Sequence, residues 1–161
     1  MQLNIMNINH KNGSYQIDEV SVTDIADKFG TPCFIYSANS ISQSFNEIKD
    51  IFCNEKNSVY YSVKANSSLS ILKLLSDLGA GFDIVSIGEL DRVIKVGVDP
   101  QKIVYSGVGK SESDIKKSIE LGIRCINVES YAELERINKI ASHLKIKAPV
   151  AIRVNPNIDP G

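Results

Sequence analysis

Lys64 has the most distinctive chemical setting in this sequence. It follows residues 59–63, an apolar run typical of a β-strand, within the segment Tyr60-Tyr61-Ser62-Val63-Lys64-Ala65-Asn66. Alternate residues of a strand share a face, so Tyr60, Ser62 and Lys64 are predicted to lie on one face. An ammonium resists burial unless it is paired, and it is also the group that forms Schiff bases with carbonyl compounds. The alternation along the strand therefore indicates that the side chain of Lys64 points into the interior of the fold at the end of the strand. The alternative is a lysine on the surface, just past the strand.

Asp83 and Arg153 are predicted to occupy the same kind of position. Asp83 lies near the C-terminal end of a second apolar strand, and Arg153 shares a strand face with Ala151. A carboxylate near a protonated Schiff base favours the charged form, and a guanidinium can bind an anionic phenolate oxygen or a pyridine nitrogen of a cofactor. The alternative is an internal Asp–Arg ion pair without a cofactor. Glu89, in the first turn of the next predicted helix, is a further candidate, and its alternative is an acid that complements the helix dipole.

Gly107 and Gly109 lie in the segment Tyr105-Ser106-Gly107-Val108-Gly109-Lys110-Ser111. Their spacing fits neither a Walker loop nor a full dinucleotide fingerprint. We interpret the segment as a tight turn between a strand and a helix.

These candidates are carried by a regular alternation of strands and helices. Strands are predicted at residues 59–63, 82–85, 103–105, 125–128 and 150–154, and helices at 68–78, 87–96, 111–121 and 130–144. Ser111 with Asp114, and Ser130 with Glu133, give helix-start signals. A repeat of this kind predicts a parallel α/β sheet with right-handed crossovers.

The period of the repeat favours a barrel. The strand centres lie near residues 61, 83, 104, 127 and 152, in steps of 22, 21, 23 and 25 residues. Such short units suit a (β/α)₈ TIM-type barrel, whose eight units need about 200–250 residues. Only four units and a fifth strand are present, so we expect the chain to be part of a longer protein. A complete small α/β domain is the alternative.

The N-terminal residues follow a different pattern. Leu3, Ile5 and Met6 begin an extended run, and Asn12-Gly13 is a strong signal for a two-residue hairpin turn. Thr23 is predicted to cap a helix over residues 24–29, followed by a short strand over 33–36 and a helix over 40–52.

Composition excludes several classes of protein. The sequence is 43% hydrophobic and 23% charged, with 18 Lys and Arg against 19 Asp and Glu, so no basic excess points to nucleic acid or to an anionic membrane. No apolar run approaches the roughly 20 residues of a membrane-spanning helix, and no signal peptide is recognisable, so a cytoplasmic protein is expected. Three scattered cysteines, Cys33, Cys53 and Cys125, and two histidines, His10 and His143, show no metal-ligand spacing, so no metal site is expected.

Several motifs together resemble a known family. The segment 61–66 resembles the first-strand motif of the fold-type III enzymes that use pyridoxal 5'-phosphate (PLP), and Gly79-Ala80-Gly81-Phe82-Asp83-Ile84-Val85-Ser86-Ile87-Gly88-Glu89-Leu90 resembles their decarboxylase branch. Tyr105-Ser106-Gly107-Val108-Gly109-Lys110, Ile126-Asn127-Val128-Glu129-Ser130 and Arg153-Val154-Asn155-Pro156 are similar to the branch that acts on diaminopimelate. The resemblance runs in order through residues 20 to 161. Ser62 and Ile87 depart from it, since alanine and a small residue are common there.

The resemblance implies a fold, a cofactor and a set of roles. Lys64 would hold PLP covalently, Asp83 would lie near that linkage, Arg153 would lie near the phenolate oxygen, and Asn66 and Glu89 would shape the pocket. The implied fold is an alanine racemase-like barrel over residues 37–161, truncated here, with residues 1–36 supplying strands to a second, β-rich domain. The full-length protein would be a homodimer.

The implied reaction is decarboxylation of meso-2,6-diaminopimelate to L-lysine and CO₂, the last step of lysine biosynthesis. The resemblance places the remaining site residues beyond Gly161, so the 161-residue chain alone is expected to be inactive. Two alternatives stay open: another decarboxylase of the group, acting on arginine, ornithine or carboxynorspermidine, and a non-catalytic relative that binds PLP or a partner.

Overall fold

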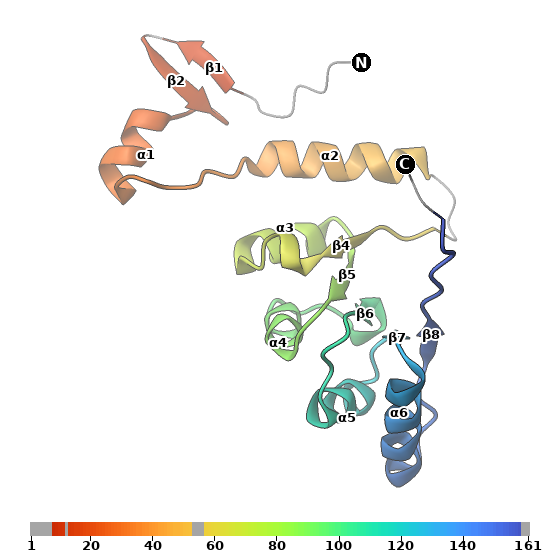
Figure 1. The fold of residues 1–161 in the computed structure, drawn as a ribbon. Helices are drawn as coiled ribbons and strands as arrows, with labels where there is room; N and C mark the ends of the chain where they lie inside the picture. Colours follow the sequence, from red (N-terminus) through yellow and green to blue (C-terminus); the bar gives the residue numbers. More distant parts are fainter. Residues whose placement is uncertain (1–7, 12, 53–56, 159–161) are drawn as a thin grey trace. The chain divides into compact units, whose positions relative to one another are not determined.

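The computed structural model describes residues 8–11, 13–52 and 57–158. The chain divides into two compact units, Met1–Asn57 and Ser58–Gly161 (Figure 1). The predicted division into residues 1–36 and 37–161 concerns the whole protein and stays a prediction.

The first unit begins with a small antiparallel sheet. Its strands are β1 (Ile8–Lys11), β2 (Ser14–Ile17) and β3 (Val20–Ser21), in that order. Lys11 pairs with Ser14, so β1 and β2 form an antiparallel hairpin, as the sequence predicts. Gly13 has a φ of +78°, a conformation that glycine adopts without a Cβ clash. The extended run expected from Leu3, Ile5 and Met6, and Asn12 itself, lie outside the described residues.

Two helices follow in this unit, and two predictions here need correction. Helix α1 (Val22–Phe29) is capped by Ser21, whose Oγ accepts the backbone N–H of Asp24, and not by Thr23. Ser21 occupies the cap position because β3 ends at Ser21 and the helix begins directly after it.

The short strand expected at residues 33–36 does not form; Phe34 in this segment is 93% exposed. An apolar run becomes a strand only where a neighbouring strand accepts its hydrogen bonds, and among the described residues none pairs here. Helix α2 (Ala38–Ile51) lies where a helix is predicted and is capped by Ser37.

The second unit is built on a parallel sheet. Its strands β4 (Tyr60–Ser62), β5 (Gly81–Ile84), β6 (Ile103–Tyr105), β7 (Cys125–Val128) and β8 (Val150–Ile152) are neighbours in the order of the chain. Between them run α3 (Leu69–Asp77), α4 (Ile87–Lys95), α5 (Glu112–Leu121) and α6 (Tyr131–Leu144). The predicted alternation of strands and helices is confirmed, and with it the α/β class.

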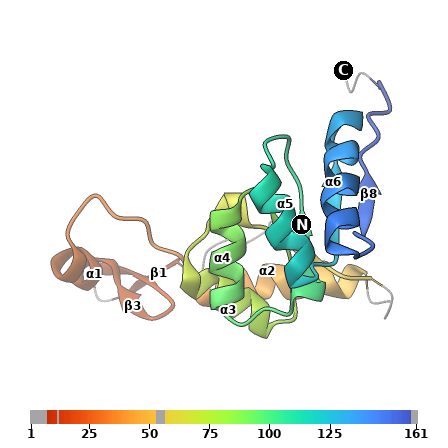
Figure 2. The same ribbon diagram turned by 90° about the horizontal axis from the view of Figure 1, so that it is seen from below.

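The two faces of this sheet differ in burial. Helices α3 to α6 lie against one face of the sheet (Figure 2). Phe82, Ile84, Tyr105 and Ile126 share a face by alternation and register and are at most 1% exposed, so they belong to the covered face. Fully burying one such side chain stabilises the fold by about 1.5–3 kcal/mol. Asp83, Val104 and Asn127 alternate with these residues and are only partly buried. The second face therefore carries the polar Asp83 and Asn127 beside Val104, and it is the more open of the two.

Serine caps fix the start of three helices in this unit. Ser86, Ser111 and Ser130 each accept the backbone N–H three residues later, which satisfies one unpaired donor of the first turn. At α5 the bond is reciprocal, because Asp114 accepts the N–H of Ser111. Both helix-start signals in the sequence are thus confirmed.

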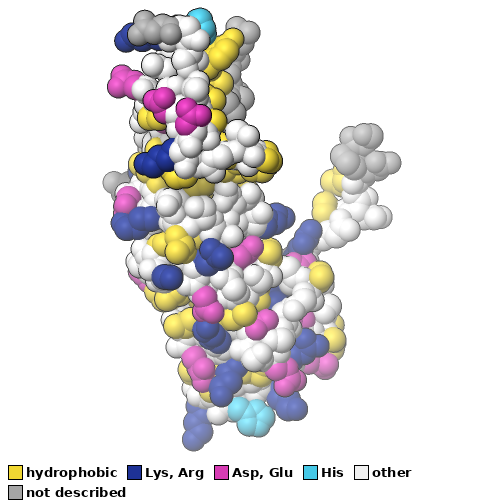
Figure 3. All heavy atoms as spheres, turned by 90° about the vertical axis from the view of Figure 1, so that its left-hand side faces the viewer, with side chains coloured by type: hydrophobic (Ala, Val, Ile, Leu, Met, Phe, Trp, Pro, Cys, Tyr) yellow, Lys and Arg dark blue, Asp and Glu magenta, His cyan; other side chains and the backbone are white. Residues whose placement is uncertain are grey.

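No helix among the described residues is both long and apolar enough to cross a membrane. On the face drawn in Figure 3, acidic and basic side chains are interspersed, in keeping with the net charge of −1.

Candidate active site

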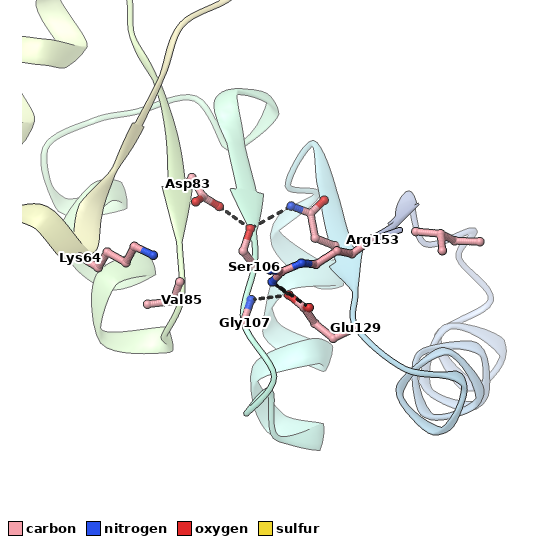
Figure 4. Close-up of a pocket in the computed structure, with 9 residues that line it drawn as sticks. Lys64, Asp83, Val85, Ser106, Gly107, Glu129 and Arg153 are labelled. Atoms are coloured by element: carbon pink, nitrogen blue, oxygen red, sulfur yellow. Dashed lines mark hydrogen bonds and ion pairs between the residues drawn. The ribbon is translucent and has the colours of Figure 1, made fainter. Parts of the chain in front are cut away.

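A cavity of about 400 Å³ lies on the open face of the parallel sheet, toward the C-terminal ends of its strands (Figure 4). Its walls come from all five strands or the segments that follow them. The lining residues are Lys64, Asp83, Val85, Ser106, Gly107, Asn127, Glu129, Ile152 and Arg153. Three of the five residues predicted from the sequence, Lys64, Asp83 and Arg153, therefore line one cavity.

Lys64 reaches this cavity by a local geometry that differs from the prediction. Strand β4 ends at Ser62, and residues Val63–Ala65 form a short 3₁₀ turn, η1. The turn directs Val63 into the core, where it is fully buried, and leaves Lys64 exposed at the cavity. Within the described residues no hydrogen bond or ion pair engages its ammonium, which points toward the cavity in Figure 4. Lys64 thus offers an unpaired primary amine.

Asp83 is held by a short chain of hydrogen bonds across three strands. The Oγ of Ser106 donates to Oδ1 of Asp83 at 2.5 Å, and Nδ2 of Asn127 donates to that Oγ at 2.8 Å. The chain fixes the carboxylate through one of its two oxygens. Ser106 and Asn127 are absent from the sequence-based candidates, although both lie at the C-terminal ends of predicted strands.

Arg153 is paired with Glu129. Its Nη1 donates to Oε1 and Oε2 of Glu129 at 3.3 and 3.1 Å, and the backbone N–H of Gly107 donates to Oε1 at 3.1 Å. Among the described residues Arg153 and Asp83 make no ion pair with each other, so the internal Asp–Arg pair is not formed. Sequence reasoning missed Glu129, whose signal was its place directly after β7.

Asn66 and Glu89 do not line the cavity. Oδ1 of Asn66 accepts the N–H of Ser68 at the start of α3, at 2.9 Å. Oε2 of Glu89 accepts the N–H of Val85 at 2.7 Å, which holds a cavity residue at the end of β5. Their direct role in shaping a cofactor pocket stays a prediction.

The turn after β6 brings the backbone close to the cavity. Gly107 has a φ of +94°, and a Cβ there would lie 3.5 Å from Cβ of Val85. The segment joins β6 to α5, as predicted, and contributes the backbone of Gly107 to the cavity wall.

Charge on the open face also acts on a thiol. Burial raises the pKa of Cys125, the positive charge of Arg124 lowers it, and the negative charge of Asp83 raises it further. Cys125 and the exposed Cys33 are free thiols. Cys53 lies outside the described residues. Among the residues that the structure describes, no group of three or more His, Cys, Asp or Glu is placed to hold a metal ion.

The sequence is similar to several enzymes of known name. It is 43% identical to the diaminopimelate decarboxylase of Vibrio cholerae over 149 residues, covering 92% of this chain and 36% of that protein. It is 50% identical to the diaminopimelate decarboxylase of Helicobacter pylori over 131 residues, covering 81% of this chain and 32% of that protein. The chain thus spans about a third of the length of these relatives.

The fold has the same neighbours. The crystal structure of diaminopimelate decarboxylase from M. jannaschii in complex with L-lysine matches with a TM-score of 0.88 and 37% identity, over 95% of this chain and 37% of that one. The family model described as "Pyridoxal-dependent decarboxylase, pyridoxal binding domain" matches residues 38–161. The resemblance seen in the sequence is therefore confirmed, and the chain belongs to the pyridoxal-dependent decarboxylase family.

Proposed function

We propose that this chain is the N-terminal part of a PLP-dependent decarboxylase that converts meso-2,6-diaminopimelate to L-lysine and CO₂. The observation that carries the proposal is the unpaired ammonium of Lys64, within the described residues, at a cavity that also holds Arg153 and Asp83. A primary amine without a partner is the group needed to bind an aldehyde covalently.

The side chains of the cavity fit PLP. The cofactor carries an aldehyde, an anionic phenolate oxygen and a ring nitrogen, and the cavity offers an amine, a guanidinium and two carboxylates. Its volume of about 400 Å³ lies within the usual range for small-ligand sites. When bound, PLP supplies an electron sink for the electron pair left behind when a carboxylate departs as CO₂.

Each residue then has a separate task. Lys64 would hold the cofactor through its amine, which lies unpaired at the cavity among the described residues. Asp83, fixed by Ser106, provides a negative charge that favours the protonated form of a nearby nitrogen. Arg153 would donate hydrogen bonds to the phenolate oxygen, from a position set by its ion pair with Glu129. Asn66 and Glu89 support the cavity from outside by fixing the chain before α3 and the end of β5.

The choice of substrate is supported by the relatives. The similar proteins of V. cholerae and H. pylori are named diaminopimelate decarboxylases, and the M. jannaschii structure contains L-lysine. L-Lysine is the product that the proposed reaction releases, so the same site chemistry suits this chain.

The proposal extends to the whole protein. The five consecutive parallel strands are taken as part of a closed (β/α)₈ barrel, because an open sheet would leave unpaired backbone groups on its outer strands. Residues 1–36 would contribute to a second β-rich domain. The protein is proposed to be a cytoplasmic homodimer, without nucleic-acid or membrane partners.

The test uses a full-length protein that carries this chain. It is loaded with PLP and given meso-diaminopimelate, L-ornithine or L-arginine, while CO₂ and the amine product are measured. We expect L-lysine from diaminopimelate, no turnover of the other two, and loss of turnover in Lys64→Ala but not in Lys95→Ala, an exposed lysine of α4. Turnover of ornithine or arginine instead would assign another decarboxylase, and PLP binding without turnover of any amino acid would assign a non-catalytic relative.

A further inference from the structure

Lys110 is a buried lysine next to the cavity, in the turn that leads from β6 to α5. Its residue is only 3% exposed. Its Nζ donates to the carbonyl oxygen of Gly107 at 2.5 Å, to the carbonyl oxygen of Asn127 at 2.8 Å and to Oε1 of Glu133 at 3.1 Å. An ammonium has three N–H donors, so all three are used.

Glu133 completes a closed ring of interactions. Its Oε1 binds Lys110, and its Oε2 accepts the backbone N–H of Glu129 at 2.7 Å. The Oε1 of Glu129 accepts the backbone N–H of Gly107, whose carbonyl oxygen binds Lys110. The ring thus runs through Lys110, Glu133, Glu129 and Gly107 and returns to Lys110. It joins the turn after β6, the end of β7 and the first turn of α6.

Two members of the ring lie at the cavity wall. Gly107 and Glu129 both line the cavity, as does Asn127, whose carbonyl Lys110 also holds. Glu129 is in turn the partner of Arg153. No member of the buried pair Lys110–Glu133 lines the cavity itself, so its effect on a ligand must pass through these neighbours.

We propose that Lys110 and Glu133 are positioning residues: their buried ion pair fixes Glu129, and through Glu129 it sets where the guanidinium of Arg153 meets the cofactor. The inference rests on the proposed function, because it assigns a purpose to the position of Arg153. It adds two residues that do not touch the ligand.

Burial itself argues for a role of this kind. Taking a lysine and a glutamate out of water is costly, and well-packed apolar residues often stabilise a core as well or better. Apolar side chains would not bind the two carbonyl oxygens or the N–H of Glu129. What the pair provides beyond stability is therefore the fixed geometry of three backbone groups at the cavity wall.

The test separates stability from positioning by removing one charge or both. Lys110→Met leaves Glu133 buried without its cation, so the thermal midpoint should fall. The double variant Lys110→Met/Glu133→Gln removes both charges, and the new amide oxygen can still accept the N–H of Glu129, so part of that loss should return. The carbonyl oxygens of Gly107 and Asn127 still lack their shared donor. Lys117→Met is the control, because Lys117 forms an exposed ion pair with Asp91 away from the cavity.

All variants are made in the full-length protein, and PLP is the probe. PLP affinity is measured by titration, and the visible circular dichroism of bound PLP reports its orientation. We expect the double variant to melt at a higher temperature than Lys110→Met while binding PLP roughly tenfold more weakly than the wild type, by analogy with the lower end of the loss seen when a residue that orients a metal ligand is replaced. Its dichroism should also differ from that of the wild type, while Lys117→Met should match the wild type in both.

The outcomes are distinguishable. If the double variant binds PLP with wild-type affinity and dichroism, whatever its thermal midpoint, the pair is only structural and the inference is wrong. If the wild-type protein itself binds no PLP, the proposed function fails first.

Discussion

The guanidinium of Arg153 binds both carboxylate oxygens of Glu129 through one nitrogen, at 3.1 and 3.3 Å. The two partners differ in exposure, since the Arg153 side chain is 68% exposed and that of Glu129 only 10%. The carboxylate is therefore anchored in the fold, and the arginine extends from it into the open cavity. An exposed ion pair contributes little to stability, so the value of this one lies in where it holds the guanidinium.

Replacing Arg153 should affect the ligand more than the fold. Arg153→Met is expected to change the free energy of unfolding by less than about 1 kcal/mol, the usual range for an exposed pair. PLP affinity in the full-length protein should fall roughly tenfold or more, because a hydrogen bond to a charged group contributes about 1.5–3 kcal/mol. Urea denaturation and PLP titration measure the two effects, with Arg124→Met, an exposed arginine directly before β7, as the control. A large loss of stability with unchanged PLP affinity would mean that Arg153 is structural.

Cys125 reports the charge on the open face. Burial is the main cause that raises the pKa of its thiol, and Asp83 adds to it. Only the thiolate is alkylated, so the raised pKa moves the rate profile to higher pH than that of an ordinary cysteine. Asp83→Asn removes one raising cause and should move the profile back toward lower pH, which means faster alkylation at a fixed pH. Peptide mass mapping of Cys125 measures this, and Asp91→Asn is the control. An unchanged or slower rate in Asp83→Asn would show that the carboxylate does not act on this thiol.

The caps of α3 and α5 provide a matched pair for stability. Ser111 accepts the N–H of Asp114 and forms a capping box, whereas Ser68, at the same position of α3, makes no side-chain cap bond. Ser111→Ala should reduce the free energy of unfolding by about 1 kcal/mol, the typical cost of losing a cap, and Ser68→Ala should cost much less. Chemical denaturation of both variants checks the difference. Equal losses would mean that the cap bond at Ser111 adds nothing beyond helix propensity.

The strands and helices of the second unit could be predicted closely because burial leaves a strong mark on sequence. Apolar runs predict β6 and β7 at their observed limits, Ile103–Tyr105 and Cys125–Val128. The strands and helix caps of the first unit were harder to predict. Residues 33–36 have the composition of a strand, but composition does not reveal whether a neighbouring strand is there to pair with them. At α1 two nearby residues, Ser21 and Thr23, were both suitable caps, and the end of β3 decided between them.

Part of the candidate site could also be predicted, because the alternation of residues along a strand is visible in the sequence. The alternation of residues along a strand correctly predicted that Asp83 and Arg153 lie on the same side of the sheet, where both line the cavity, since both lie in or directly after a strand. For Lys64 the alternation predicted the side of the sheet on which it lies but not the backbone geometry, because the 3₁₀ turn η1 replaces the end of the strand. The interactions of Glu129 and Lys110 join segments about twenty residues apart, and periodicity contains no information about such contacts. The roles of Lys64, Asp83, Arg153, Asn66 and Glu89 toward PLP stay predictions.

Lys64 is proposed to hold the cofactor, and borohydride labelling tests this role most directly. The full-length protein is incubated with PLP, treated with borohydride to make the lysine–PLP linkage permanent, and digested for peptide mass mapping. We predict the added mass on the peptide that contains Lys64, and no labelled peptide in Lys64→Ala. Label on another lysine in the wild-type protein, or an equally labelled Lys64→Ala variant, would contradict the assignment.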